Sequence, residues 1–246
     1  IQRSEVKRHL NEYFYYGGLP EILSFKNKRA MLSSLYQKIY LGDICARNNI
    51  KNDRVLNILI KKMAESVKQP LSYNRLKNVI VTTGSPISVP TTIDYVDYAS
   101  DSWLILPMEN EVGKLTEKEM QKKYYFVDNG LLNLFLMNSE TSLLENMVAV
   151  ELCRRFGKKN VFFLNAEKEI DFILPDEKLA IQVSYSIKDE TTYNREVPPL
   201  AKYAKAHEDW KCLLITYDEE GTEEGISVVP VWKWLMEAIG STNLTN

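Results

Sequence analysis

The sequence predicts an α/β protein (in the α+β sense) made of two parts: a helical part that ends in two strands, and then a mixed β-sheet with flanking helices. In the first half, apolar residues recur every three or four positions, which is the spacing of amphipathic helices. In the second half, short apolar runs alternate with helical stretches, which favours a mixed sheet covered on both faces. The 246 residues allow two modest domains or one large one.

The N-terminal segment, residues 1–28, is predicted to be a charged helix followed by a turn. Gly17-Gly18 stops this helix, and Pro20 opens the next turn. Apolar residues at helical spacing then predict a helix over residues 29–48. Because the chain begins without methionine and inside an apparent helix, we expect a preceding portion, with residues 1–28 as a helical linker from it.

Three further helices and two strands are predicted in the rest of the first half. The first helix covers residues 53–68, Ser72 opens a shorter one, and Ser88 is the N-cap of the third. Strand-like runs follow at residues 103–108 and 123–127, with a polar stretch between them. Three helices followed by a hairpin is the layout of a winged helix-turn-helix.

The first half is therefore predicted to be a winged-helix-like domain over residues 29–137. A winged helix that reads DNA needs cations on the helix that enters the major groove. Residues 88–101 instead contain three aspartates and no lysine or arginine, which favours a winged helix that packs or binds a partner. The candidate nucleic-acid contacts are basic residues at and before the second strand: Lys114, Lys118, Lys122 and Lys123.

The second half, residues 138–240, begins with an amphipathic helix that is followed by three short β runs at residues 161–164, 170–174 and 179–185. The elements expected after them are a helical stretch over 190–207, placed after Pro198-Pro199, a strand at 211–217, an acidic loop at 218–225, a strand at 226–231 and a helix at 232–239. Residues 241–246 are expected to be a disordered tail.

Four polar residues of this half resemble a catalytic set. Glu145 lies on the helix, Asp171 on the second β run, and Gln182 and Ser184 on the third. This order resembles the core of the restriction-endonuclease-like, or PD-(D/E)xK, superfamily, which implies a mixed sheet of that type. In active members of that superfamily, the helix donates a glutamate, the second strand an aspartate and the third strand Glu-x-Lys. The acids hold Mg²⁺, and the lysine positions the attacking water.

Two of the four positions depart from that chemistry. Gln182 has a neutral amide where a carboxylate would bind the cation, and Ser184 has neither the reach nor the charge of lysine. Glu145 and Asp171 remain as metal ligands, and we expect them to bind Mg²⁺ weakly. The sequence therefore predicts a vestigial nuclease site, while enzymatic activity stays an open question.

Three short signatures resemble a second, larger family. They are YGGLPE at residues 16–21, YYFVDNGLLN at residues 124–133, and LLENMVAVEL together with EIDFIL and IQVSYS in the second half. They are similar to the C-terminal region, of the DUF4143 type, of an uncharacterised family of AAA-type P-loop ATPases. The resemblance implies a preceding ATPase domain, which would bind ATP and be a partner of this chain. The chain itself has no GxxxxGK[ST] phosphate loop.

Composition narrows the partners and the compartment. The formal net charge is −2, so nucleic acid would have to be held by a local basic patch. No apolar run is long enough to span a bilayer, so no membrane partner is expected. Cys45, Cys153 and Cys212 are far apart and odd in number, which favours reduced thiols and a cytoplasmic location. The oligomeric state is not predicted.

Three functions follow as hypotheses. The first is a non-catalytic binding or regulatory module that engages a partner protein or nucleic acid and requires no cofactor of its own. The second is an active Mg²⁺-dependent DNA nuclease with an unusual site. The third is a winged-helix DNA-binding regulator that uses the four lysines named above.

Overall fold

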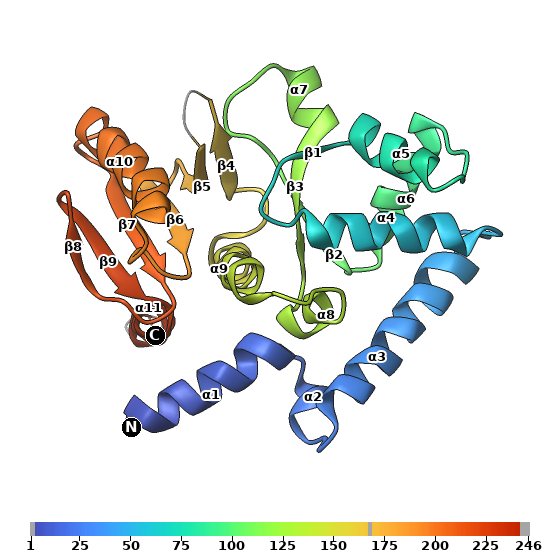
Figure 1. Ribbon diagram of the computed structural model, residues 1–246, viewed down its shortest axis with the longest axis horizontal. Coiled ribbons are helices and arrows are strands. Elements are labelled where there is room, and N and C mark those ends of the chain that lie inside the picture. Colours follow the sequence, from blue (N-terminus) through green and yellow to red (C-terminus); the bar gives the residue numbers. More distant parts are fainter. Residues whose placement is uncertain (1–2, 167–168, 242–246) are drawn as a thin grey trace. The chain divides into compact units, whose positions relative to one another are not determined.

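The computed structural model describes residues 3–166 and 169–241, and it confirms a mixed α/β protein (Figure 1). The chain divides into two compact units: one runs from Glu12 to Val150, and the other combines the residues up to Asn11 with those from Glu151 onward. The divisions fall inside helices α1 (Arg3–Tyr16) and α9 (Glu140–Phe156), which contribute residues to both units. The domain limits predicted from the sequence, after residues 28, 137 and 240, lie at other positions than these divisions. They remain predictions.

The unit from Glu12 to Val150 is mainly helical. Its helices are α2 (Pro20–Leu23), α3 (Lys28–Lys38), the π-helix η1 (Ile39–Ala46), α4 (Asp53–Glu65), α5 (Tyr73–Thr82), α6 (Val89–Asp101), α7 (Leu115–Met120) and α8 (Asn129–Asn133). The predicted caps are confirmed: the Ser72 side chain accepts a hydrogen bond from the Arg75 N–H, and that of Ser88 accepts one from the Thr91 N–H. Each cap satisfies a backbone donor that would otherwise lack a partner at the start of a helix.

A three-stranded antiparallel sheet completes this unit. Its strands are β1 (Leu71–Ser72), β2 (Ile105–Met108) and β3 (Gln121–Phe126), in the order β1-β3-β2. The two strands expected from the sequence are confirmed as β2 and β3. The sequence did not predict the two-residue strand β1, nor α7 in the polar connection between β2 and β3.

The helix predicted over residues 29–48 was only partly right. An α-helix ends at Lys38, and the chain continues as the eight-residue π-helix η1. Apolar spacing cannot tell the two helix types apart over so short a stretch, because both return a side chain to the same face after about four residues. Tyr40 and Ile44, four residues apart, are both buried by η1.

The second unit contains a six-stranded mixed sheet. Its strands are β4 (Phe162–Asn165), β5 (Glu169–Leu174), β6 (Leu179–Ser184), β7 (Lys211–Thr216), β8 (Gly221–Glu223) and β9 (Ile226–Pro230), in the order β4-β5-β6-β7-β9-β8. The central pairs β6–β7 and β7–β9 are parallel, and the outer pairs are antiparallel. Strand β8 lies within the stretch that was expected to be an acidic loop.

Helix α10 (Glu190–Ala206) packs on this sheet through an apolar core (Figure 1). The predicted helical range of residues 190–207 is confirmed, but the helix does not follow the proline pair: it begins at Glu190, is capped by Asp189, and continues through Pro198 and Pro199. Proline removes a helical hydrogen bond and usually ends a helix. Here the burial of Val197, Leu200 and neighbouring residues against the sheet keeps the helix continuous.

Helix α11 (Val231–Ser241) closes the described part of the chain. Ser241 belongs to this helix and not to the predicted tail, and residues 242–246 lie outside the described residues. None of the helices in residues 3–166 and 169–241 combines the length and the apolar composition that crossing a membrane requires.

Candidate functional site

Two predicted site residues lie side by side on the larger sheet. Strands β5 and β6 are antiparallel, and the pairing of Phe172 with Ile181 brings Asp171 next to Gln182. The Gln182 Oε1 accepts a hydrogen bond of 3.2 Å from the Asp171 N–H, and Asp171 Oδ2 accepts one of 2.9 Å from the Val183 N–H. Both side chains are buried, so their polar atoms depend on these internal partners.

A third residue of this cluster, Glu196, was missed by the sequence reasoning. It lies on α10 and is buried, and its Oε2 accepts a hydrogen bond of 2.5 Å from the Gln182 side-chain amide. Its other oxygen accepts one of 2.7 Å from the Arg195 guanidinium. The sequence held no signal for it, because the helical spacing alone does not show that Glu196 reaches Gln182, which lies 14 residues earlier in the chain. The Gln182 amide thus joins the backbone of Asp171 to the Glu196 carboxylate.

The electrostatics of Glu196 follow from this position. Burial raises the pKa of the Glu196 carboxyl, and the negative charge of Asp171 raises it further, while the hydrogen bonds from Gln182 and Arg195 oppose the shift. The folded protein therefore holds a proton on Glu196 more tightly than the unfolded chain does. Ionising Glu196 costs folding free energy, and this cost is absent below the unfolded-state pKa.

We expect the variant Glu196→Gln to gain stability over wild type as the pH rises. Near pH 4 both proteins have a neutral side chain here and should melt at similar temperatures. Above the raised folded-state pKa, only the wild-type protein carries a buried charge at this position. If the variant is more stable by about 1 kcal/mol, its Tm should be roughly 2–4 °C higher in a chain of this size. Thermal melting from pH 4 to pH 8 measures the difference, and a constant difference across that range would contradict the assignment.

Ser184 lies two residues after Gln182 on β6, on the same face of the strand. It is buried, and its Oγ donates a hydrogen bond of 2.9 Å to the Ser186 carbonyl. The hydroxyl is therefore used to bind the chain's own backbone where the strand ends. A lysine at this position would have carried a positive charge toward the cluster.

The fourth predicted residue, Glu145, belongs to the other unit. It is buried, and its Oε1 is 3.2 Å from the Lys123 Nζ and accepts a hydrogen bond of 2.8 Å from the Tyr125 hydroxyl. Lys123 and Tyr125 lie on the same face of β3, two residues apart. A buried carboxylate with a cationic partner already has its charge compensated, which leaves it less able to bind a metal ion.

Two of the four lysines predicted to contact nucleic acid hold carboxylates in the structure. The Lys123 side chain is 0% exposed, which disfavours the predicted contact with a phosphate at this position. Lys122 is within 3.4 Å of Glu109 and 3.1 Å of Glu119. Burial by itself lowers the pKa of Lys122, but the hydrogen bond and charge of Glu119 outweigh it, so the net shift is upward.

The other two lysines lie on the connection between β2 and β3. The Lys118 Nζ donates a hydrogen bond of 2.6 Å to the Glu111 carbonyl, and Lys114 is exposed at the start of α7. Their role in nucleic-acid binding remains a prediction. Because Lys122 and Lys123 are paired with carboxylates, the basic patch is smaller than the sequence suggested.

The signatures YGGLPE and YYFVDNGLLN meet at a buried aspartate. Asp128 accepts hydrogen bonds of 2.8 Å from the Gly18 N–H, 2.8 Å from the Gly130 N–H and 3.2 Å from the Leu131 N–H. Burial raises the pKa of Asp128, and these backbone donors lower it in part. Gly17 has a φ of +78°, and a Cβ there would lie 2.0 Å from the Asp128 carboxylate, so only glycine fits.

Two asparagines extend this hydrogen-bond network to the helix that carries Glu145. The Asn146 side chain accepts a hydrogen bond of 2.7 Å from the Phe126 N–H, and its amide donates 3.0 Å and 2.9 Å bonds to the Phe126 carbonyl and Asn129 Oδ1. Asn129 in turn donates to the Phe14 and Leu143 carbonyls. These signature residues therefore connect α1, β3, α8 and α9 inside one unit, which is a structural role.

The close approach at Gly130 predicts a measurable cost of substitution. A Cβ at this position would lie 2.2 Å from the Tyr16 carbonyl oxygen, which belongs to the backbone and cannot turn away. Gly130→Ala should destabilise the protein by roughly 1–3 kcal/mol, the usual range for overpacking. Gly42→Ala is the matched control, because a Cβ there meets nothing within 4 Å. Urea denaturation compares the two, and equal stabilities would refute the packing.

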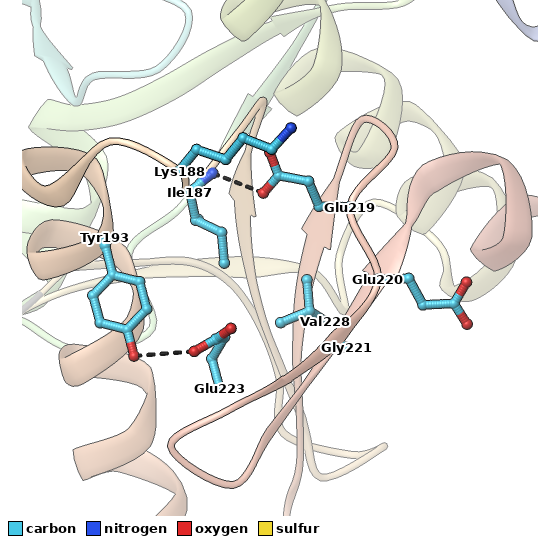
Figure 2. A pocket seen from close by; sticks show the side chains of 8 residues that line it. All are labelled: Ile187, Lys188, Tyr193, Glu219, Glu220, Gly221, Glu223 and Val228. Carbon is cyan, nitrogen blue, oxygen red and sulfur yellow. Dashed lines mark hydrogen bonds between the residues drawn. The ribbon is translucent and has the colours of Figure 1, made fainter.

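A surface pocket of about 220 Å³ lies in the sheet unit (Figure 2). Its lining residues are Ile187, Lys188, Tyr193, Glu219, Glu220, Gly221, Glu223 and Val228. The acids are engaged by the chain itself: Glu219 accepts from the Ile187 N–H at 3.0 Å, Glu223 accepts from the Tyr193 hydroxyl at 3.3 Å, and Glu220 pairs with Lys233. In residues 3–166 and 169–241, no group of three or more His, Cys, Asp or Glu side chains could hold a metal ion.

Comparison with known proteins places these observations in a family. A family model described as Domain of unknown function (DUF8612) matches residues 7–142. The chain is 30% identical over 256 residues to an uncharacterized protein of Methanocaldococcus jannaschii, covering 95% of this chain and 57% of that protein. It is 30% identical over 242 residues to an uncharacterized protein of Haemophilus influenzae, covering 94% and 59%. The chain thus spans less than two thirds of either relative, and no solved structure matches it.

These findings correct the family inferred from the short signatures. The matching model is DUF8612, so the predicted membership of the DUF4143 type and of an AAA-type ATPase family was wrong. The ATPase domain, its ATP and its role as a partner were implied only by that membership and fall with it. Because the model covers more than half of the residues, the chain belongs to the family described as Domain of unknown function, DUF8612.

Proposed function

We propose that this chain is a non-catalytic binding module that retains a vestigial nuclease-like site. The observation that carries the proposal is the Gln182 side chain, whose amide donates to the Glu196 carboxylate while its carbonyl accepts from the Asp171 backbone. In a metal-dependent nuclease, a cation would balance the carboxylates of such a cluster. Here the uncharged Gln182 amide donates a hydrogen bond to the Glu196 carboxylate instead. Groups of the chain itself therefore act as partners of the cluster.

The arrangement of elements supports the finer fold assignment that the proposal uses. The order α4, β1, α5, α6, β2, β3, with strands arranged β1-β3-β2, is the order expected of a winged helix. Helix α9 followed by β4, β5 and β6, with Asp171 on β5 and Gln182 on β6, is consistent with the core of a restriction-endonuclease-like domain. Both assignments are part of the proposal.

The engagement of the other predicted groups supports the loss of catalysis. Glu145 is paired with Lys123, and the Ser184 hydroxyl is bound to a backbone carbonyl. A nuclease of this type needs a carboxylate set that binds Mg²⁺ and a cation that positions water. Gln182 is neutral and Ser184 is uncharged. The cluster on the sheet therefore has an incomplete carboxylate set for Mg²⁺, and Ser184 cannot act as the cation that positions water.

Metal binding tests this proposal directly. Mn²⁺, which has an EPR signal when free in solution, should show no saturable binding to the wild-type protein below about 1 mM. The double variant Asp171→Asn/Glu196→Gln should behave in the same way. Micromolar binding by wild type that is lost in the double variant would contradict the proposal.

One observation favours the alternative of an active Mg²⁺-dependent nuclease. Glu196 brings a carboxylate to the cluster that the sequence reasoning did not count, and its pKa is raised by burial and then by the Asp171 charge. Asp171 and Glu196 would then be the pair that binds Mg²⁺, because one or two carboxylates plus water suffice for that ion. DNA cleavage that requires both residues would establish this alternative.

A further inference from the structure

Two large apolar side chains are exposed near the C-terminal end of α6. Trp103, two residues after the helix, is 71% exposed, and Leu41 on η1 is 52% exposed. The segments that carry them meet where the Ser102 Oγ donates a hydrogen bond of 3.5 Å to the Asp43 carbonyl. Exposed apolar groups on adjoining segments are typical of binding surfaces, and tryptophan is over-represented among residues that dominate binding energy.

The charge of the adjacent helix face identifies what could cover these side chains. Asp94, Asp97 and Asp101 are spaced by three and four residues, so they project from one face of α6, and all three are exposed. Helix α6 contains no lysine or arginine. A surface with this charge repels phosphates and attracts cationic groups.

The aspartates of this face also act on one another. Partial burial raises the pKa of Asp97, and the negative charges of Asp101, Asp94 and Glu119 raise it further, while Lys122 opposes them. Like charges held this close cost free energy in the unbound protein. A cationic partner would relieve that repulsion as well as form new ion pairs.

We propose that Leu41, Trp103 and the aspartates Asp94, Asp97 and Asp101 form a docking surface for an arginine- or lysine-rich segment of a partner protein. This inference rests on the proposed function as a binding module and specifies the chemistry of the partner. A guanidinium can stack on the Trp103 ring while its neighbours pair with the carboxylates of α6. The face of α6 that would enter a DNA groove in a winged-helix regulator is thereby assigned to protein binding.

Fluorescence anisotropy with a short fluorescein-labelled peptide of alternating arginine and alanine tests the proposal. We expect the wild-type protein to bind this peptide and not a matched glutamate–alanine peptide. The variant Asp94→Asn/Asp97→Asn/Asp101→Asn should bind about tenfold more weakly, and Trp103→Ala about threefold more weakly. These positions are exposed, so both variants should fold, which circular dichroism verifies.

The control separates this surface from general electrostatic attraction. Asp176→Asn/Glu177→Gln/Glu208→Gln removes the same number of charges from exposed positions in the other unit, and it should leave binding unchanged. Equal weakening by both triple variants, the absence of peptide binding, or binding of duplex DNA that depends on Trp103 would each overturn the docking surface. None of these results bears on metal binding at Asp171 and Glu196, so the proposed function stands or fails separately.

Discussion

Replacing Lys123 by methionine is expected to destabilise the unit from Glu12 to Val150 by about 3–5 kcal/mol, the usual cost of leaving a buried charge without its partner. Lys123 is fully buried, and its Nζ lies 3.2 Å from the Glu145 carboxylate. Methionine fills a similar volume but removes the cationic partner of Glu145, while the hydrogen bond from the Tyr125 hydroxyl remains. Urea denaturation, followed by circular dichroism, measures the loss.

The double variant Lys123→Met/Glu145→Gln is the control for this prediction. It removes both charges and keeps an oxygen that can accept from the Tyr125 hydroxyl, so most of the lost stability should return. A double variant as unstable as Lys123→Met would mean that the loss comes from packing. It would then remove the argument that the Glu145 charge is compensated inside the protein.

Replacing Gln182 by glutamate is the second change with a large expected effect. A third carboxylate would enter the buried cluster of Asp171 and Glu196, and the hydrogen bond that the amide now donates to Glu196 would be lost. We expect a loss of about 3–5 kcal/mol at pH 8 in the presence of EDTA. The loss should shrink as the pH falls toward 5, because protonation of a carboxyl restores a donor and removes a charge.

Metal ions extend this second test. Mn²⁺ should raise the Tm of Gln182→Glu more than that of wild type, since a ligand that binds only the folded state stabilises it. Asp171→Asn/Gln182→Glu is the matched control and should lose this response. A variant Gln182→Glu that is as stable as wild type in EDTA at pH 8 would show that the three side chains are not held close together.

Local signals in the sequence predicted the elements more successfully than the contacts between them. The caps at Ser72 and Ser88 were predictable because a serine side chain acts within its own helical turn. The pairing of Asp171 with Gln182 was also within reach, because adjacent short strands fix which residues become neighbours. Both features depend on residues that are close in the sequence.

The features that were missed depend on distant contacts. Glu196 was passed over because its hydrogen bond to Gln182 forms only when α10 packs against the sheet. Lys123 was counted as a surface cation because its partner Glu145 lies 22 residues further along the chain, on α9. Charge in a sequence does not reveal which charges face inward.

Cleavage of DNA tests the central claim most directly. Labelled duplex and branched DNA are titrated with the wild-type protein in the presence of Mg²⁺, anisotropy reports binding, and a gel resolves the products afterwards. The account predicts uncut DNA with wild type, and the same result with Asp171→Ala and Glu196→Ala. Products that appear with wild type and vanish with either variant would show that these carboxylates still perform metal-dependent hydrolysis.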